Sequence, residues 1–196
     1  MKNDRIYFQG AFSPNRTVLK KAFSSNRYFS ERSKIFRKEI EKVDALPGRN
    51  QKIKALRAIA GNKVLMSWAN SGELMMLYRG FRDQGAFQDM INMYGKAENE
   101  DFKRAQTVRE MLGGAYNKVK RPDKAIRIAQ MLFAEGRETG EVYQILGRAR
   151  LLQSDSAESG NEKRTFLEES AAFYEEGFSR FFEFYPGIQA VHRHIE

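Results

Sequence analysis

The sequence predicts an all-α protein, a right-handed α-solenoid of helix hairpins preceded by a basic helical arm. The main observation is a repeated Leu-Gly pair, since Leu112-Gly113 and Leu146-Gly147 lie 34 residues apart. Helical repeat proteins carry such self-similarity at a fixed period. The composition agrees, because only 4 of the 196 residues are proline and 30% are charged. No run of alternating apolar and polar residues is long enough to indicate a sheet.

A period of 34 residues is the length of a tetratricopeptide unit, in which two antiparallel helices form one repeat. In the central unit, Leu112 and Gly113 are followed by Tyr116 and Ala125, where this repeat carries an aromatic and a small residue. The preceding unit has matching residues at Leu74, Leu77, Phe81, Tyr94 and Ala97. Its spacing to the central unit is 35 residues, which predicts one extra loop residue near Asn99.

The third unit repeats the start of the pattern at Leu146-Gly147. Its second helix arrives late, because Tyr174 and Gly177 fit the pattern only after an insertion of about 11 residues, a length that a surface loop tolerates. The polar stretch at 153–163 is predicted to be that loop. The aromatic stripe of the helix that follows is predicted to be a buried seam.

Two helices are predicted before the repeats, at residues 16–24 and from Ser30 to about residue 45. One face of the second helix is apolar, and its members are Ile35, Phe36, Ile40 and Val43. Leu46-Pro47-Gly48 ends it. We divide the chain accordingly into a basic N-terminal helical arm at 1–45 and a tetratricopeptide-like repeat domain at 46–196.

The next predicted helix covers about residues 50–69, with Gly61-Asn62 as a candidate interruption. Asn70 or Ser71 is expected to cap the first helix of the preceding unit, and Gly85 to form the turn to its second helix. Pro122 is placed in the first turn of a helix, where the missing backbone N–H costs no hydrogen bond.

Charge is distributed unevenly along the chain. Residues 1–70 carry 16 Lys and Arg against 5 Asp and Glu, whereas residues 71–196 carry 18 against 20. Aromatic residues lie among the basic ones in the first stretch, a composition that can follow a nucleic-acid backbone and stack on bases. Two other interpretations stay open, an acidic protein partner or a merely solvated face, and the solvated face is favoured.

Catalytic and metal-binding residues are scarce. Cysteine is absent, which excludes disulfides and thiolate sites. His192 and His194 are two residues apart, unlike the i, i+4 pair that binds zinc on a helix. Gly113-Gly114 is not followed by the Lys-Ser/Thr of a phosphate-binding loop. We therefore expect no enzyme activity, no metal and no cofactor. Because the sequence shows neither a membrane-spanning apolar stretch nor a signal peptide, we expect a cytoplasmic protein.

The first helices of tetratricopeptide units line a groove that binds partners. In this register the predicted groove residues are Arg79, Arg82, Glu110, Asn117, Lys118, Gln144 and Arg148. The cations among them could bind carboxylates. Chaperone-tail adaptors of this repeat class carry a clamp of Lys, Asn and Arg, and the corresponding positions hold Met75, Arg79, Met111, Glu141 and Ile145. The clamp is absent, which disfavours a chaperone-adaptor function.

Several stretches resemble one family more specifically. They lie at 77–85, 108–112, 143–148 and 174–178, and the most specific is the closing string Tyr185-Pro186-Gly187-Ile188-Gln189-Ala190-Val191. Together they resemble the TRAF-binding domain of the apoptosis signal-regulating kinases and its bacterial relatives. The resemblance implies a regulatory helical-repeat scaffold that binds adaptor proteins or supports an attached effector domain.

The predicted function is therefore a non-catalytic protein–protein interaction scaffold or regulatory module, whose partner is another protein or a fused effector domain. No membrane partner is expected. The alternative function is nucleic-acid binding by a helical-repeat protein that uses its basic N-terminal half.

Overall fold

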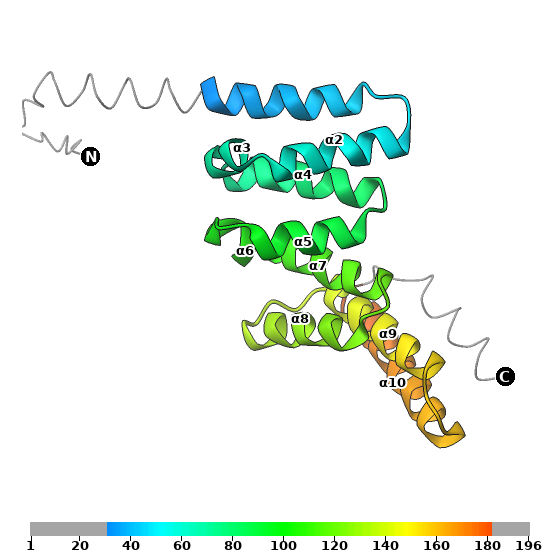
Figure 1. Cartoon of the computed structure of the whole chain (residues 1–196). Helices are drawn as coiled ribbons and strands as arrows, with labels where there is room; N and C mark the ends of the chain where they lie inside the picture. The colour runs from blue at the N-terminus through cyan, green and yellow to red at the C-terminus, as the bar shows by residue number, and fades with distance from the viewer. Residues whose placement is uncertain (1–30, 182–196) are drawn as a thin grey trace, which may run out of the picture.

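The computed structural model describes residues 31–181, and within that range every regular element is a helix (Figure 1). A first helix covers residues 31–44. The helices that follow are α2 (Arg49–Gly61), α3 (Lys63–Trp68), α4 (Ser71–Asp83), α5 (Phe87–Lys96), α6 (Glu100–Arg104), α7 (Gln106–Lys118), α8 (Pro122–Ala134), α9 (Gly140–Asp155) and α10 (Gly160–Phe181). The predicted all-α solenoid is confirmed. The predicted helix at 16–24, the two histidines and the string from Tyr185 lie outside the described residues.

The helix at residues 31–44 packs into the same apolar core as the repeats, although the sequence predicted it as part of a separate arm. Phe36, only 1% exposed, lies in one cluster of buried side chains with Leu56 of α2 and Leu77 of α4. Ile35 was expected on the same face, and this was wrong: it is 46% exposed, because neighbouring residues on a helix point about 100° apart. Helix 31–44 and α2 form an additional hairpin at the start of the stack, and the domain boundary after this helix stays a prediction.

Polar contacts also tie this hairpin to its neighbour. The Ser33 hydroxyl donates a hydrogen bond to Glu73 of α4, whose side chain is buried. The same carboxylate accepts from the backbone N–H of Asn70 at 3.0 Å, and the Asn70 side chain accepts from the backbone N–H of Glu73 at 3.0 Å, which completes a capping box. The guanidinium of Arg32 lies 4.6 Å from the centroid of the Trp68 ring. Asn70 is thus confirmed as the cap of α4.

Most of the other predicted starts and stops are confirmed. Asn62 separates α2 from α3 and caps α3 with its side chain. Gly85 has a φ of 64°, the left-handed region that glycine tolerates best, and it forms the turn from α4 to α5. Pro122 is the first residue of α8. Near Asn99 the expected extra loop residue is replaced by a short helix, α6, which Asn99 caps.

The last hairpin is enlarged, but by longer helices and not by the predicted loop at 153–163. α9 continues to Asp155 and α10 begins at Gly160, so the expected polar loop is wrong over most of its length. Two glycines allow these helices to approach closely. A Cβ atom at Gly147 would lie 2.9 Å from the ring of Tyr174, and one at Gly177 would lie 2.7 Å from Cβ of Tyr143. Tyr174 is buried, whereas Phe166, Phe173 and Phe181 of the same stripe are half-buried, so the predicted buried seam is confirmed only in part.

The buried side chains form two apolar clusters along the stack. One extends from helix 31–44 to Ala115 of α7, and the other joins α8 and α9, with Tyr116 and Phe173 packed against it. Figure 1 shows the change of direction between them: the helices from 31–44 to α5 lie one above another, whereas α9 and α10 are inclined to that column. Helix α7 lies at the junction.

Candidate functional site

The predicted groove residues lie on the first helices of three successive hairpins, α4, α7 and α9. The four cations among them, Arg79, Arg82, Lys118 and Arg148, are exposed. Arg82 forms an ion pair at 2.9 Å with its neighbour Asp83. Within residues 31–181 the other three cations have no hydrogen bond or ion pair. They are available to a ligand, whereas Gln144 is half-buried.

Two of the predicted groove residues belong to the repeat packing instead. Asn117 is buried, and its side-chain amide donates a 2.9 Å hydrogen bond to the backbone carbonyl of Ile145 in α9. Glu110 accepts hydrogen bonds from Gln106 at 2.9 Å and from the Thr139 hydroxyl at 2.7 Å. Thr139 caps α9. Both side chains therefore fix the position of α9 on α7, and their assignment to a partner site stays a prediction.

Arg79 also lines a hollow that sequence reasoning missed. This hollow has a volume of about 220 Å3 and lies where helix 31–44, α2 and α4 meet. The sequence did contain a signal for it, the apolar face of Phe36, Ile40 and Val43. Because that face was assigned to a separate arm, no site was expected between it and α4.

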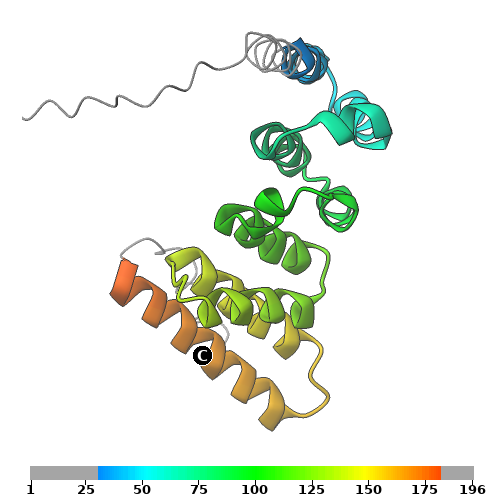
Figure 2. The ribbon, with the colours of Figure 1, turned by 90° about the vertical axis from the view of Figure 1, so that its left-hand side faces the viewer.

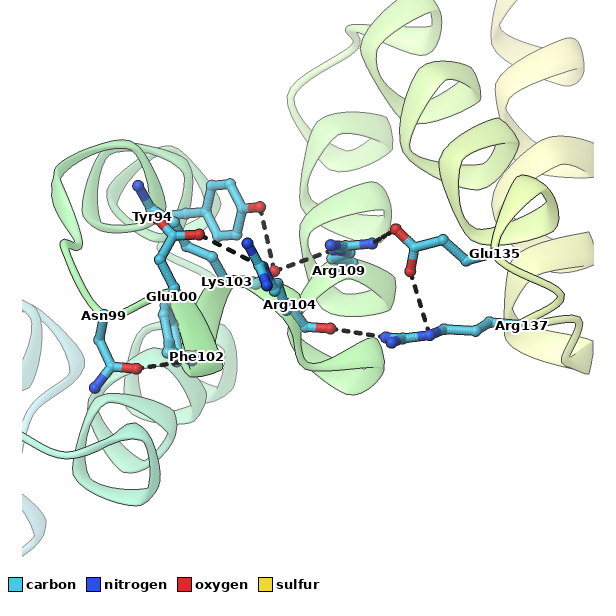
Figure 3. Close-up of polar contacts among 9 residues, drawn as sticks. All are labelled: Tyr94, Asn99, Glu100, Phe102, Lys103, Arg104, Arg109, Glu135 and Arg137. Atoms are coloured by element: carbon cyan, nitrogen blue, oxygen red, sulfur yellow. Dashed lines mark hydrogen bonds and ion pairs between the residues drawn. The ribbon is translucent and has the colours of Figure 1, made fainter.

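A polar junction joins the two apolar clusters where α6, α7 and the end of α8 meet (Figure 3). The side chain of Arg109, only 9% exposed, pairs with Glu135 at 2.5 Å and donates to the backbone carbonyl of Lys103 at 3.1 Å. Arg137 pairs with Glu135 at 3.2 Å and donates to the carbonyl of Arg104 at 2.7 Å. The two arginines thus satisfy carbonyls at the end of α6 that its own helix leaves without partners.

Electrostatics at this junction favour the charged carboxylate. The hydrogen bond from Arg109 lowers the pKa of Glu135 below its ordinary value, against the opposing effect of desolvation, and the charges of Arg137 and Arg104 act in the same direction as Arg109. Burial raises the pKa of the nearby Tyr94 hydroxyl, which donates to the Lys103 carbonyl at 3.4 Å. These groups serve as donors and acceptors that hold the hairpins together.

Two kinds of feature are absent from the described part of the chain, metal-ligand clusters and membrane-spanning helices. In residues 31–181 no group of three or more His, Cys, Asp and Glu side chains is placed to hold a metal ion. None of the helices in that range is long and apolar enough to cross a membrane.

Stacked helix hairpins with interlocked glycines and exposed cations on their first helices define a tetratricopeptide-like helical-repeat protein, a class that typically binds other proteins. Residues 86–192 match the family TPR-S, Tetratricopeptide Repeats-Sensor, and the chain belongs to this family. Comparison with curated proteins and with solved structures gave no significant match.

Proposed function

We propose that this protein is a non-catalytic interaction scaffold that regulates a protein partner or an attached effector domain, in the manner of the TRAF-binding domains it resembles. The match to a family of repeat sensors supports a regulatory role of this kind. The proposed location is the cytoplasm.

One observation carries the proposal: within residues 31–181, three exposed cations on successive first helices form no ion pair. Arg79, Lys118 and Arg148 come from α4, α7 and α9, and none has an ion pair within the described range. Solenoids present the residues of such helices along an extended binding surface. Arginine on such a surface is suited to binding carboxylates, because a guanidinium binds a carboxylate through two parallel hydrogen bonds. The partner is therefore a protein segment rich in carboxylates.

The test is affinity capture from native lysate with mass spectrometry, using the wild type and charge-reversal variants. Lys118→Glu and Arg148→Glu should lose the captured partner. Arg127→Glu is the matched control, since Arg127 is exposed on α8, a second helix, and has no ion pair within residues 31–181. If both groove variants retain the same partner as the control, the groove is not its binding surface.

Nucleic-acid binding remains the second candidate, supported by exposed cations of the first hairpin and of the start of α3. Within the described residues these cations lack ion pairs, and they are Arg37, Lys38, Lys54 and Lys63. Phe36 cannot stack on a base, because it is buried. Retention on heparin and on single-stranded RNA across a salt series tests this candidate, and absence of binding at low salt removes it.

A further inference from the structure

The hollow beside Arg79 lies entirely before the segment that matches the family. Its lining residues run from Ile40 to Gln84, whereas the family match begins at residue 86. Figure 2 views the upper helices nearly end-on, with helix 31–44 and α4 toward one side of the stack and α2 toward the other. The lining residues come from helix 31–44, α2 and α4, so the hollow lies between the first helices of two successive hairpins, with α2 beside them.

Apolar side chains form much of this hollow. Ile40, Val43 and Leu56 contribute core surface, and Met76 stands at its edge with 39% of its surface exposed. Pockets for drug-sized ligands measure about 300–1,000 Å3. At about 220 Å3, this hollow is too small for such a ligand and suits a single side chain.

The charged side chains at the edge of the hollow favour a negatively charged ligand. Lys52 and Arg79 line it, and neither has an ion pair within the described range. Of the two lining carboxylates, Asp83 is already paired with Arg82 at 2.9 Å, which leaves only Asp44 to balance two cations. A carboxylate at this position gains charge-assisted hydrogen bonds.

A second hollow, of about 310 Å3, lies between helix 31–44, α2 and α3. Its lining cation, Lys42, is paired with Glu39, so nothing there selects a charged ligand. The hollow beside Arg79 differs from this second hollow. Its lining includes apolar side chains and also two cations, Lys52 and Arg79, that form no ion pair within the described range.

We propose that this hollow is the anchor point for the protein partner: it takes one apolar side chain of the partner, while Lys52 and Arg79 bind a carboxylate next to that side chain. This inference rests on the proposed function and assigns the recognition step to the junction of the first hairpin with α4. The family segment from residue 86 then supplies the rest of the scaffold.

The test is methyl NMR on the full chain with labelled Met, Ile and Leu. The probe is the blocked tetrapeptide acetyl-Ala-Leu-Glu-Ala-amide, and its control carries Lys in place of Glu. Titration with the Glu peptide to millimolar concentration should shift the methyl signals of Met76, Ile40 and Leu56 and reach saturation. The Lys peptide should bind about tenfold more weakly, because it loses a charge-assisted contact and meets like charge.

Two substitutions test whether Arg79 binds the carboxylate of the peptide. Arg79→Glu should weaken the Glu peptide about tenfold, and Arg127→Glu should leave its affinity unchanged. Equal shifts with both peptides, or no saturable shift, overturn the inference. It is also overturned if these methyls shift on dilution of the free protein, which identifies a second copy as the occupant, or if they show cross-peaks to residues 1–30.

The proposed function and the proposed anchor point can fail independently of each other. If Arg148→Glu abolishes partner capture but the peptide does not bind, the groove functions without this anchor. If the peptide binds but the wild-type protein captures no specific partner, the anchor exists and the proposed function is wrong.

Discussion

The first and last hairpins of the stack are held together in different ways. In the last hairpin, glycines let α9 and α10 approach so closely that a Cβ atom at Gly177 would lie 2.7 Å from Cβ of Tyr143. In the first hairpin, helix 31–44 and α2 meet through ordinary apolar side chains such as Phe36 and Leu56. Close approach requires glycine and an aromatic at set positions, whereas side-chain packing accepts many residues. Of these two hairpins, therefore, the last carries the repeat pattern in its sequence and the first does not.

The largest effect is expected from Phe36→Ala, which tests whether the first hairpin belongs to the common core. Deleting a fully buried phenylalanine side chain costs about 3–5 kcal/mol of the free energy of unfolding, because the cavity only partly collapses. Ile35→Ala is the matched control, since Ile35 is 46% exposed, and it should cost less than about 0.5 kcal/mol. Urea unfolding followed by circular dichroism measures both. Equal effects of the two substitutions would mean that helix 31–44 does not pack on the repeats.

A smaller effect is expected from two glycine substitutions, one within the last hairpin and one on α4 where it faces Leu56 of the first hairpin. Gly177→Ala should cost about 2 kcal/mol, because the new methyl meets an atom close to the backbone of α9 that cannot move aside. Gly80→Ala should change stability little, since its Cβ would meet the end of the Leu56 side chain at 3.0 Å, which can rotate, and alanine favours the helix. Thermal unfolding of both variants distinguishes the two kinds of packing. A larger loss for Gly80→Ala would reverse the contrast drawn between the hairpins.

The polar junction between the two regions should contribute less than either core. Arg109→Met removes the ion pair with Glu135 and the hydrogen bond to the Lys103 carbonyl, and should cost about 1–2 kcal/mol. Hydrogen exchange of α6 measures it directly, because that helix loses the donor to one of its last carbonyls. Arg104→Met is the control, since the Arg104 side chain is 73% exposed and its one ion pair within residues 31–181 is with Glu100 of its own helix. Unchanged protection of α6 in Arg109→Met would show that the junction does not hold it.

Local features of the fold were predictable from sequence, and pairings between distant segments were less so. Asn70, Gly85 and Pro122 act on the backbone within a few residues, and each lies where it was expected. Asn117 occupies a groove position by register, but its amide bonds the next repeat, a contact that depends on how α9 packs. The same holds for the hollow beside Arg79. It requires helix 31–44 to lie next to α4, and no motif in either helix specifies that pairing.

The smallest effect concerns acid pH, and it again probes the junction. The Arg109 hydrogen bond lowers the pKa of Glu135 in the folded protein below the ordinary value of 4.5. A carboxylate whose folded pKa is lowered contributes stability above its unfolded pKa, and this contribution is lost as the pH falls below that value. Glu135→Gln should therefore be less stable than the wild type at neutral pH, and the difference should shrink once the pH falls below about 4.5.

Thermal unfolding across a pH series measures this difference, and Glu168→Gln, which removes an exposed pair with Arg164 on α10, is the matched control. The control should show a smaller difference at neutral pH, because exposed pairs contribute little. If Glu135→Gln differs from the wild type equally at neutral and acid pH, its role at the junction is that of a hydrogen-bond acceptor whose charge is immaterial. The link between the two regions would then depend on the geometry of Arg109 and Arg137 alone.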